Sequence, residues 1–166
     1  MRRVYLLSVA VLALFGVYLY SRHDGVLNPA QALIWFEPDE FGDWWPMMSP
    51  DLLRKLDEFR ERLGVPVMIS PAAGSLGRNL GMFDLSQHNV DLWGEVRAVD
   101  IMPVGVDLET AYDAARAVGF TGVGLYPDWS PYPGLHLDVR PGPVALWSGW
   151  RVNGEQQYRG IGEALA

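Results

Sequence analysis

Two histidines and two aspartates in the second half of the chain have the types and spacing that could bind a metal ion. Asp100 lies within a short apolar segment rich in β-branched residues, His136 and Asp138 lie in another, and His88 lies in a loop. Residues two apart on a strand project from the same face, so His136 and Asp138 should share one side of a sheet. A carboxylate inside a buried strand is costly unless it is paired or binds a metal. Two histidines with one or two strand carboxylates therefore predict a catalytic zinc site of the His₂-carboxylate type.

The composition limits the number of domains and the class of partners. A chain of 166 residues is long enough for one domain with a core but hardly for two. The formal net charge of −7 provides no basic footprint, so we predict no nucleic-acid partner. The chain has no cysteine, which excludes disulfides and thiolate ligands and leaves nitrogen and oxygen as metal ligands.

The N-terminus has the pattern of a membrane segment. Arg2 and Arg3 precede the uncharged run Val4–Tyr20, whose 17 residues would cover about 25 Å as a helix. The arginines favour a single-pass, N-inside anchor in the inner membrane, with the rest of the chain in the periplasm or outside the cell. A cleaved signal peptide and an anchor that later leaves the bilayer are the alternatives. The segment Tyr18–Arg22 lacks the small residues of a cleavage site, which favours the uncleaved anchor.

We expect an α+β domain, with a small central antiparallel sheet and outer helices, to position the site on its sheet. Residues 50–63 and 108–118 have apolar side chains at helical spacing, and Ser49 and Asp107 are suitable N-caps. Asn153-Gly154 is a strong signal for a hairpin turn. The expected strands are residues 65–70, 96–102, 120–126, 134–140, 144–152 and 156–158.

Four motifs resemble those of the M15 family of zinc peptidases, the group of D-alanyl-D-alanine carboxypeptidases and phage endolysins. They are Ser-Gln-His at 86–88, Arg-Ala-Val-Asp-Ile at 97–101, Gly-Val-Gly-Leu-Tyr-Pro at 122–127 and Leu-His-Leu-Asp-Val-Arg at 135–140. The similarity covers about residues 41–150 and is greatest to the branch with a histidine–apolar–aspartate motif. Together with the hydropathy pattern, it divides the chain into a membrane segment at 1–24, a linker at 25–48, a peptidase domain at 49–158 and a frayed tail at 159–166.

The resemblance implies a cofactor, a substrate class and roles for individual residues. It implies that Zn²⁺ is bound by His88, Asp100 and His136, and that Ser86 orients the substrate. The implied activity is hydrolysis of peptide bonds in peptidoglycan stem peptides, by a carboxypeptidase or an endopeptidase. A phage lysis protein or another protein that degrades cell walls would have this activity.

The acidic ligand departs from the family's spacing. In the family this ligand usually falls seven residues after the first histidine, where this chain has Glu95, whereas Asp100 is twelve residues after it. We favour Asp100 because its neighbours match the family motif and those of Glu95 do not. Residues 89–95 would then contain a five-residue insertion with Trp93, which could shape the cleft.

Two further positions of the family pattern hold different residues here. The acid that many members place three residues before the last histidine is replaced by Pro133. Asp138, or else Asp128, could act as the catalytic base, and Asp138 could equally orient a ligand histidine. The family's substrate-binding arginine is missing from its usual place. Arg78 could bind a substrate carboxylate instead, or it could be a surface residue without a role.

Two other functions remain open from the sequence. A membrane-tethered or virion-associated binding module could keep the metal site without turnover, and the proline at position 133 favours it. A metal-free structural domain with buried histidines is the third alternative. The motif context of His88 and His136 argues against this last alternative.

Overall fold

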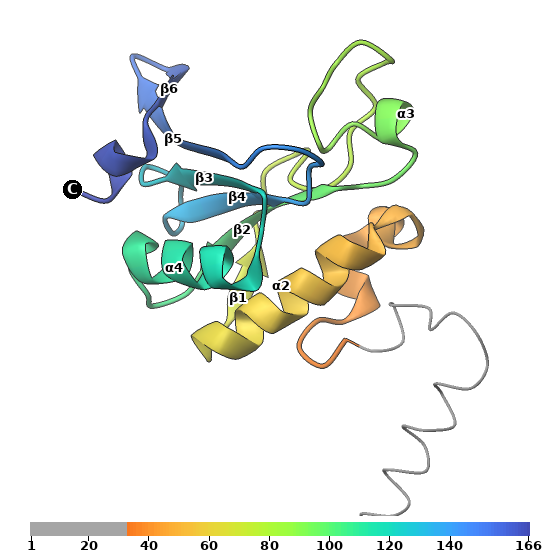
Figure 1. The fold of residues 1–166 in the computed structure, drawn as a ribbon, viewed down its shortest axis with the longest axis horizontal. Coiled ribbons are helices and arrows are strands. Elements are labelled where there is room, and N and C mark those ends of the chain that lie inside the picture. Colours follow the sequence, from red (N-terminus) through yellow and green to blue (C-terminus); the bar gives the residue numbers. More distant parts are fainter. Residues whose placement is uncertain (1–32) are drawn as a thin grey trace, which may run out of the picture. The chain divides into compact units, whose positions relative to one another are not determined.

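The structure, a computed structural model, describes residues 33–166 as one six-stranded sheet with helices against it (Figure 1). The strands are β1 (Val67–Ile69), β2 (Ala98–Pro103), β3 (Gly122–Tyr126), β4 (Gly134–Asp138), β5 (Ala145–Val152) and β6 (Glu155–Arg159). The α-helices are α2 (Pro50–Leu63), α3 (Val90–Trp93) and α4 (Leu108–Val118), and the 3₁₀ helices are η2 (Pro38–Met47) and η3 (Ile161–Ala164). The α+β prediction is confirmed.

The expected membrane segment at 1–24 and the first part of the linker lie outside the described residues. Within residues 33–166, none of the helices has both the length and the apolar character needed to cross a bilayer.

The sheet has the strand order β1-β2-β4-β3-β5-β6, and β3 and β5 are its one parallel pair among the described strands. The predicted antiparallel sheet is therefore correct only in part. The parallel pair follows from the connectivity. The chain reverses direction after β4, so β5 runs opposite to β4 and, because β4 is antiparallel to β3, in the same direction as β3.

The two long helices begin and end where the sequence predicts. The Asp107 side chain accepts a hydrogen bond from the backbone N–H of Thr110 at 2.7 Å and caps α4. Gly64 and Gly119 follow α2 and α4 in the left-handed conformation, with φ of 65° and 89°. Ser49 occupies the N-cap of α2, but its hydroxyl makes no capping hydrogen bond.

Helices α2 and α4 lie on the same side of the sheet and bury its apolar face (Figure 1). Alternate strand residues point toward these helices, because side chains alternate between faces along a strand. They include Val99, Ile101, Val123, Leu125, Leu135 and Leu137, all fully buried. Phe59 of α2 meets Phe120 edge to face, with ring centroids 6.3 Å apart.

Two terminal segments are more ordered than the sequence indicates. The tail, expected to fray, contains η3, whose Ile161 packs against the core, and Ser148 donates a hydrogen bond to the carbonyl of Gly160 at 3.0 Å. The end of the linker forms η2, and Phe41 there is buried. The predicted hairpin turn is confirmed, with positive φ at both Asn153 and Gly154.

Replacing Phe59 with alanine should lower the free energy of unfolding by about 3–5 kcal/mol, because the deletion leaves a cavity beneath α2. Urea denaturation followed by circular dichroism measures the change. Glu61→Ala, an exposed substitution on the same helix, should change the value by less than about 0.5 kcal/mol. Equal stability of the two variants would show that the helix does not pack as described.

Candidate metal centre

Three neighbouring strands present one face of the sheet, opposite to the face that α2 and α4 cover. The Cα partner of His136 on β4 is Asp100 on β2 and, on the other side, Gly124 on β3. Directly paired residues share a face, so Asp100 and His136 project to the same side. Asp138 lies two residues further along β4 on that side.

The long loop before α3 brings His88 over this face. The backbone N–H of Arg78 donates to the carbonyl of His88 at 2.8 Å, and the N–H of Val90 donates to the carbonyl of Arg78 at 3.0 Å. The backbone N–H of His88 also donates to the Ser86 hydroxyl at 3.3 Å. Residues 70–89 thus form a loop without a regular element, as expected for the position of His88, but hydrogen bonds hold the end of this loop in place.

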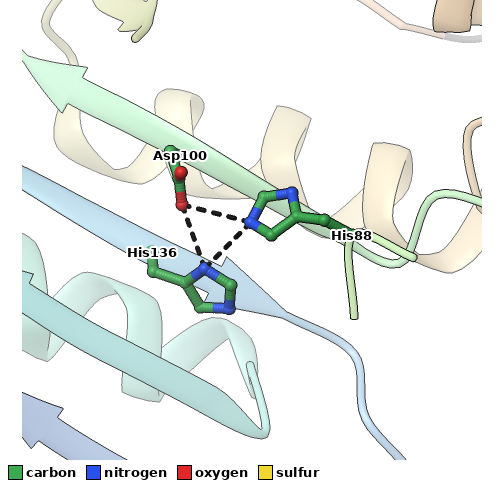
Figure 2. Close-up of side chains that lie close together, drawn as sticks. All are labelled: His88, Asp100 and His136. Atoms are coloured by element: carbon green, nitrogen blue, oxygen red, sulfur yellow. Dashed lines mark hydrogen bonds and ion pairs between the residues drawn. The ribbon is translucent and has the colours of Figure 1, made fainter. Parts of the chain in front are cut away.

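The three predicted ligands meet at one point (Figure 2). Nε2 of His88 lies 3.2 Å from Nδ1 of His136 and 3.3 Å from Oδ1 of Asp100. The same carboxylate oxygen lies 3.0 Å from Nδ1 of His136. All three side chains are buried. Residues distant in sequence therefore place three potential ligand atoms within one small volume.

Each histidine has an acceptor on its other ring nitrogen. Nδ1 of His88 contacts the carbonyl oxygen of Leu76, and Nε2 of His136 lies 3.0 Å from Oδ2 of Asp138. A carbonyl and an ionised carboxylate can only accept, so these ring nitrogens carry the hydrogens. In the neutral rings, the nitrogens that face the cluster are then lone-pair donors, which is the tautomer that metal binding needs.

The donor set fits a zinc ion. With both histidines neutral, two imidazole lone pairs and one carboxylate oxygen converge, an arrangement that repels itself unless a proton or a metal ion supplies a positive charge. Zinc bonds of about 2.0–2.1 Å at tetrahedral angles separate neighbouring ligand atoms by about 3.3 Å. The three separations of 3.0–3.3 Å agree with this value. Three protein ligands also leave a fourth position for water or substrate.

The electrostatics of the cluster lead to the same conclusion. Burial works to lower the pKa of His136, but hydrogen bonds with Asp100 and Asp138 outweigh it and raise the pKa to about 9. Burial lowers the pKa of His88 below its usual value, with Asp100 opposing the shift. Burial alone would raise the pKa of Asp100, but hydrogen bonds with both histidines lower it well below its usual range. Without a metal, a proton on His136 would supply the positive charge beside the Asp100 carboxylate, and a bound zinc ion would take its place.

Asp138 lies beneath the cluster and not at its open side. Its side chain is fully buried, and its carboxylate accepts hydrogen bonds from Arg140 Nε at 2.8 and 3.0 Å as well as contacting His136. A Cβ atom on Gly122 would lie 2.1 Å from Oδ2 of Asp138, so this glycine makes room for the carboxylate. The geometry is that of a group that orients His136, one of the two roles considered for Asp138.

A cavity of about 520 Å³ opens beside the cluster. It is lined by Arg78, Ser86, Gln87, His88, Asp100, Tyr126, Trp129, His136, Arg140, Trp147, Gln156 and Tyr158. Both predicted substrate contacts, Ser86 and Arg78, are on this wall. Nη2 of Arg78 lies 3.6 Å from Oδ2 of Asp100, and its Nε donates to the carbonyl of Gly74 at 2.7 Å.

The aromatic wall of the cavity was not among the predicted site residues. Tyr126 stacks on Trp129 at 4.2 Å between ring centroids, and the indole N–H of Trp147 donates to the Tyr126 hydroxyl at 3.0 Å. The Trp147 ring lies 5.1 Å from that of His136. Burial raises the pKa of Tyr126 well above its usual value, so the phenol keeps its proton. The sequence contained one signal of this wall, a glycine inside an expected strand. Gly124 has no side chain, and the Trp147 ring fills the space that this leaves.

The alternative acids lie away from the cluster. A carboxylate oxygen of Glu95 is 3.4 Å from Nε of Arg97, and Glu95 is outside both the three-residue cluster and the cavity wall. Asp128 accepts from the backbone N–H of Arg151 and lines a separate cavity. Trp93, which we expected to lie in an insertion that could shape the cleft, does not line the site cavity, but its indole N–H donates to the carbonyl of Ser86 at 2.8 Å.

Replacing the two candidate acids one at a time should separate their roles. Asp100→Asn should weaken zinc binding by more than about 100-fold, because the carboxylate faces both histidines. Glu95→Gln should leave the affinity unchanged. Competition against a zinc-sensitive dye measures both constants. The reverse result would make Glu95 the ligand.

A methyl group at position 122 should disturb the metal site without touching a ligand. Gly122→Ala should displace the Asp138 carboxylate from His136 and weaken zinc binding by about 10–100-fold. The matched control is Gly160→Ala, whose Cβ would meet open space. Equal zinc affinity of the two variants would contradict the orienting role of Asp138.

One of three comparisons with known proteins found a match, and that match agrees with this geometry. No curated protein and no solved structure shows significant similarity to the chain. The family model for peptidase M15 matches residues 23–130, more than half of the chain. The match includes His88 and Asp100 and ends before His136, which the fold brings to the same point. A histidine–aspartate–histidine cluster of this kind fits the zinc site of these peptidases, and the chain belongs to the peptidase M15 family.

Proposed function

We propose that this protein is a zinc-dependent peptidase that hydrolyses peptide bonds in peptidoglycan stem peptides. The observation that carries the proposal is the convergence of His88, Asp100 and His136 at the edge of an open cavity. Family membership supports the metallopeptidase class. The peptidoglycan substrate and a role in cell-wall degradation, such as phage lysis, are our extension of it.

The chain's own residues would divide the work at the site. Zinc held by the three ligands would supply a Lewis acid that lowers the pKa of bound water and polarises a carbonyl. Asp138 fixes the orientation of His136 from below. The Tyr126 hydroxyl accepts from Trp147 and keeps its own proton, so it could donate a hydrogen bond to a substrate carbonyl oxygen.

The charge of the cavity suits a peptide with a free carboxylate. Arg78 lines the cavity and is partly exposed there, and its guanidinium could pair with a carboxylate in a bidentate manner. Arg140 also lines the cavity, but its Nε and Nη2 both contact the buried Asp138 carboxylate, which balances its charge, whereas Nε of Arg78 donates to the neutral carbonyl of Gly74. We therefore propose Arg78 as the residue that contacts the substrate's carboxylate, with Ser86 on the same wall.

A non-catalytic binding module is the second candidate, and one observation favours it. Among residues 33–166, Asp100 is the one carboxylate on the wall of the cavity. Asp138 is buried beneath the site and Pro133 replaces the usual acid, so a separate proton shuttle is missing from that wall. A membrane-tethered or virion-associated module could use the same site to hold a metal and a ligand without turnover.

The location of the domain is proposed from the sequence alone. The uncharged run Val4–Tyr20 after Arg2 and Arg3 would anchor the chain in the inner membrane with its N-terminus inside. The zinc domain would then face the periplasm or the cell exterior, where peptidoglycan is found.

Digestion of purified peptidoglycan by the full-length protein in detergent tests the proposed activity. The wild type should release stem-peptide fragments that mass spectrometry identifies, and His136→Ala should release none, because it removes a zinc ligand. Glu61→Ala, remote from the site, should digest like the wild type. Zinc binding without any digestion would favour the binding module.

A further inference from the structure

An ordered loop between β1 and α3 exposes four apolar side chains. Leu80, Met82, Phe83 and Leu85 are 41%, 60%, 99% and 74% exposed, although each would normally favour burial. Figure 1 shows this part of the chain extending on the side of the sheet away from α2 and α4. We call residues 80–85 the apolar loop. The metal site and its cavity make no use of these four side chains.

The backbone of the apolar loop is hydrogen-bonded within the protein. The Asn89 side chain donates to the carbonyls of Gly81 and Asp84, both at 2.7 Å, and accepts from the N–H of Leu80 at 3.2 Å. The Asp91 carboxylate accepts from the N–H of Gly81 at 2.7 Å. These contacts fix the shape of the loop and satisfy several of its polar groups from inside.

Polar groups satisfied in this way are what a loop needs before it can enter lipid. A backbone N–H or carbonyl that leaves water for hydrocarbon without a partner costs several kcal/mol. The acidic member of the loop, Asp84, directs Oδ1 to the backbone N–H of Ser86 at 2.8 Å. The hydrogen bonds hold both ends of the loop, and the backbone of Met82 and Phe83 at its tip can stay in the hydrated headgroup layer while their side chains enter the interface. A loop held at both ends, with an exposed apolar tip and an expected membrane segment a short linker away, favours a lipid surface as the occupant.

We propose that the apolar loop docks into the surface of a lipid bilayer and holds the rim of the site there. The inference rests on the proposed membrane anchor and not on the proposed peptidase activity. Twelve residues separate Tyr20 from Leu33, a span of at most about 45 Å when extended. An anchor at Val4–Tyr20 would keep the domain at high local concentration beside the bilayer, so a small apolar area suffices for docking.

Docking would also place the rim of the cavity beside the metal cluster at the membrane surface. The apolar loop leads directly into Ser86 and His88, which line the cavity. With side chains such as Phe83 in the interface, about 5–10 Å deep, this rim would lie at the membrane surface. Substrates presented close to the bilayer would then reach the site most readily.

A single-cysteine label tests the docking directly, because the chain has no cysteine of its own. The full-length Phe83→Cys protein is labelled with an environment-sensitive fluorophore and reconstituted into phosphatidylcholine liposomes that contain lipid-borne quenchers. We expect its emission to shift to the blue and most of its fluorescence to be quenched. The matched control, Glu61→Cys on the exposed side of α2, should show neither change. A label at Met82→Cys should lose its quenching when Phe83→Asp is added.

Flotation of the same liposomes separates the docking from the anchor. Protein that floats while position 83 stays unquenched would overturn the docking and leave the anchor intact. Protein that does not float and is not quenched would overturn both. Disulfide-linked dimers of unlabelled Phe83→Cys, formed without quenching of the labelled protein, would identify a second copy of the chain as the occupant and overturn the lipid proposal. None of these readouts depends on peptidase activity.

Discussion

Three ligand atoms that face one another and need a shared positive charge are the constraint on which the site depends. His88, Asp100 and His136 are each buried, and each also contacts a group outside the cluster, respectively the Leu76 carbonyl, the Arg78 guanidinium and the Asp138 carboxylate. The Leu76 carbonyl and the Asp138 carboxylate determine which ring nitrogens carry hydrogens. A divalent cation would supply the positive charge that the three ligand atoms share, and the separations of these atoms already suit zinc.

The sheet creates space for this cluster by placing glycines beneath large side chains. Gly122 lies under the Asp138 carboxylate and Gly124 under the Trp147 ring, where a Cβ atom would come within 2.1 and 2.4 Å of them. The opposite face of the same strands carries Val123 and Leu125, which pack into the core. One short strand thus supports the core with one face and leaves room for the metal site with the other.

The sequence predicts much of this arrangement, because its signals are local. Helix α4 follows from apolar spacing between Asp107 and Gly119, and the last hairpin follows from Asn153-Gly154. The three ligands could be named from motifs that resemble one family, and the fold brings them together. The parallel pairing of β3 with β5, the packing of the tail and the burial of Asp138 depend on contacts between distant segments. Local patterns contain no information about such contacts.

X-ray absorption at the zinc edge of the full-length protein tests the central claim most directly. The spectrum should show a few nitrogen and oxygen neighbours at about 2.0–2.1 Å, together with the outer-shell scattering of two imidazoles. Loss of one imidazole contribution in His88→Ala would identify that ligand. A spectrum with oxygen neighbours alone, or one unchanged by His88→Ala and by His136→Ala, would contradict the proposed metal site.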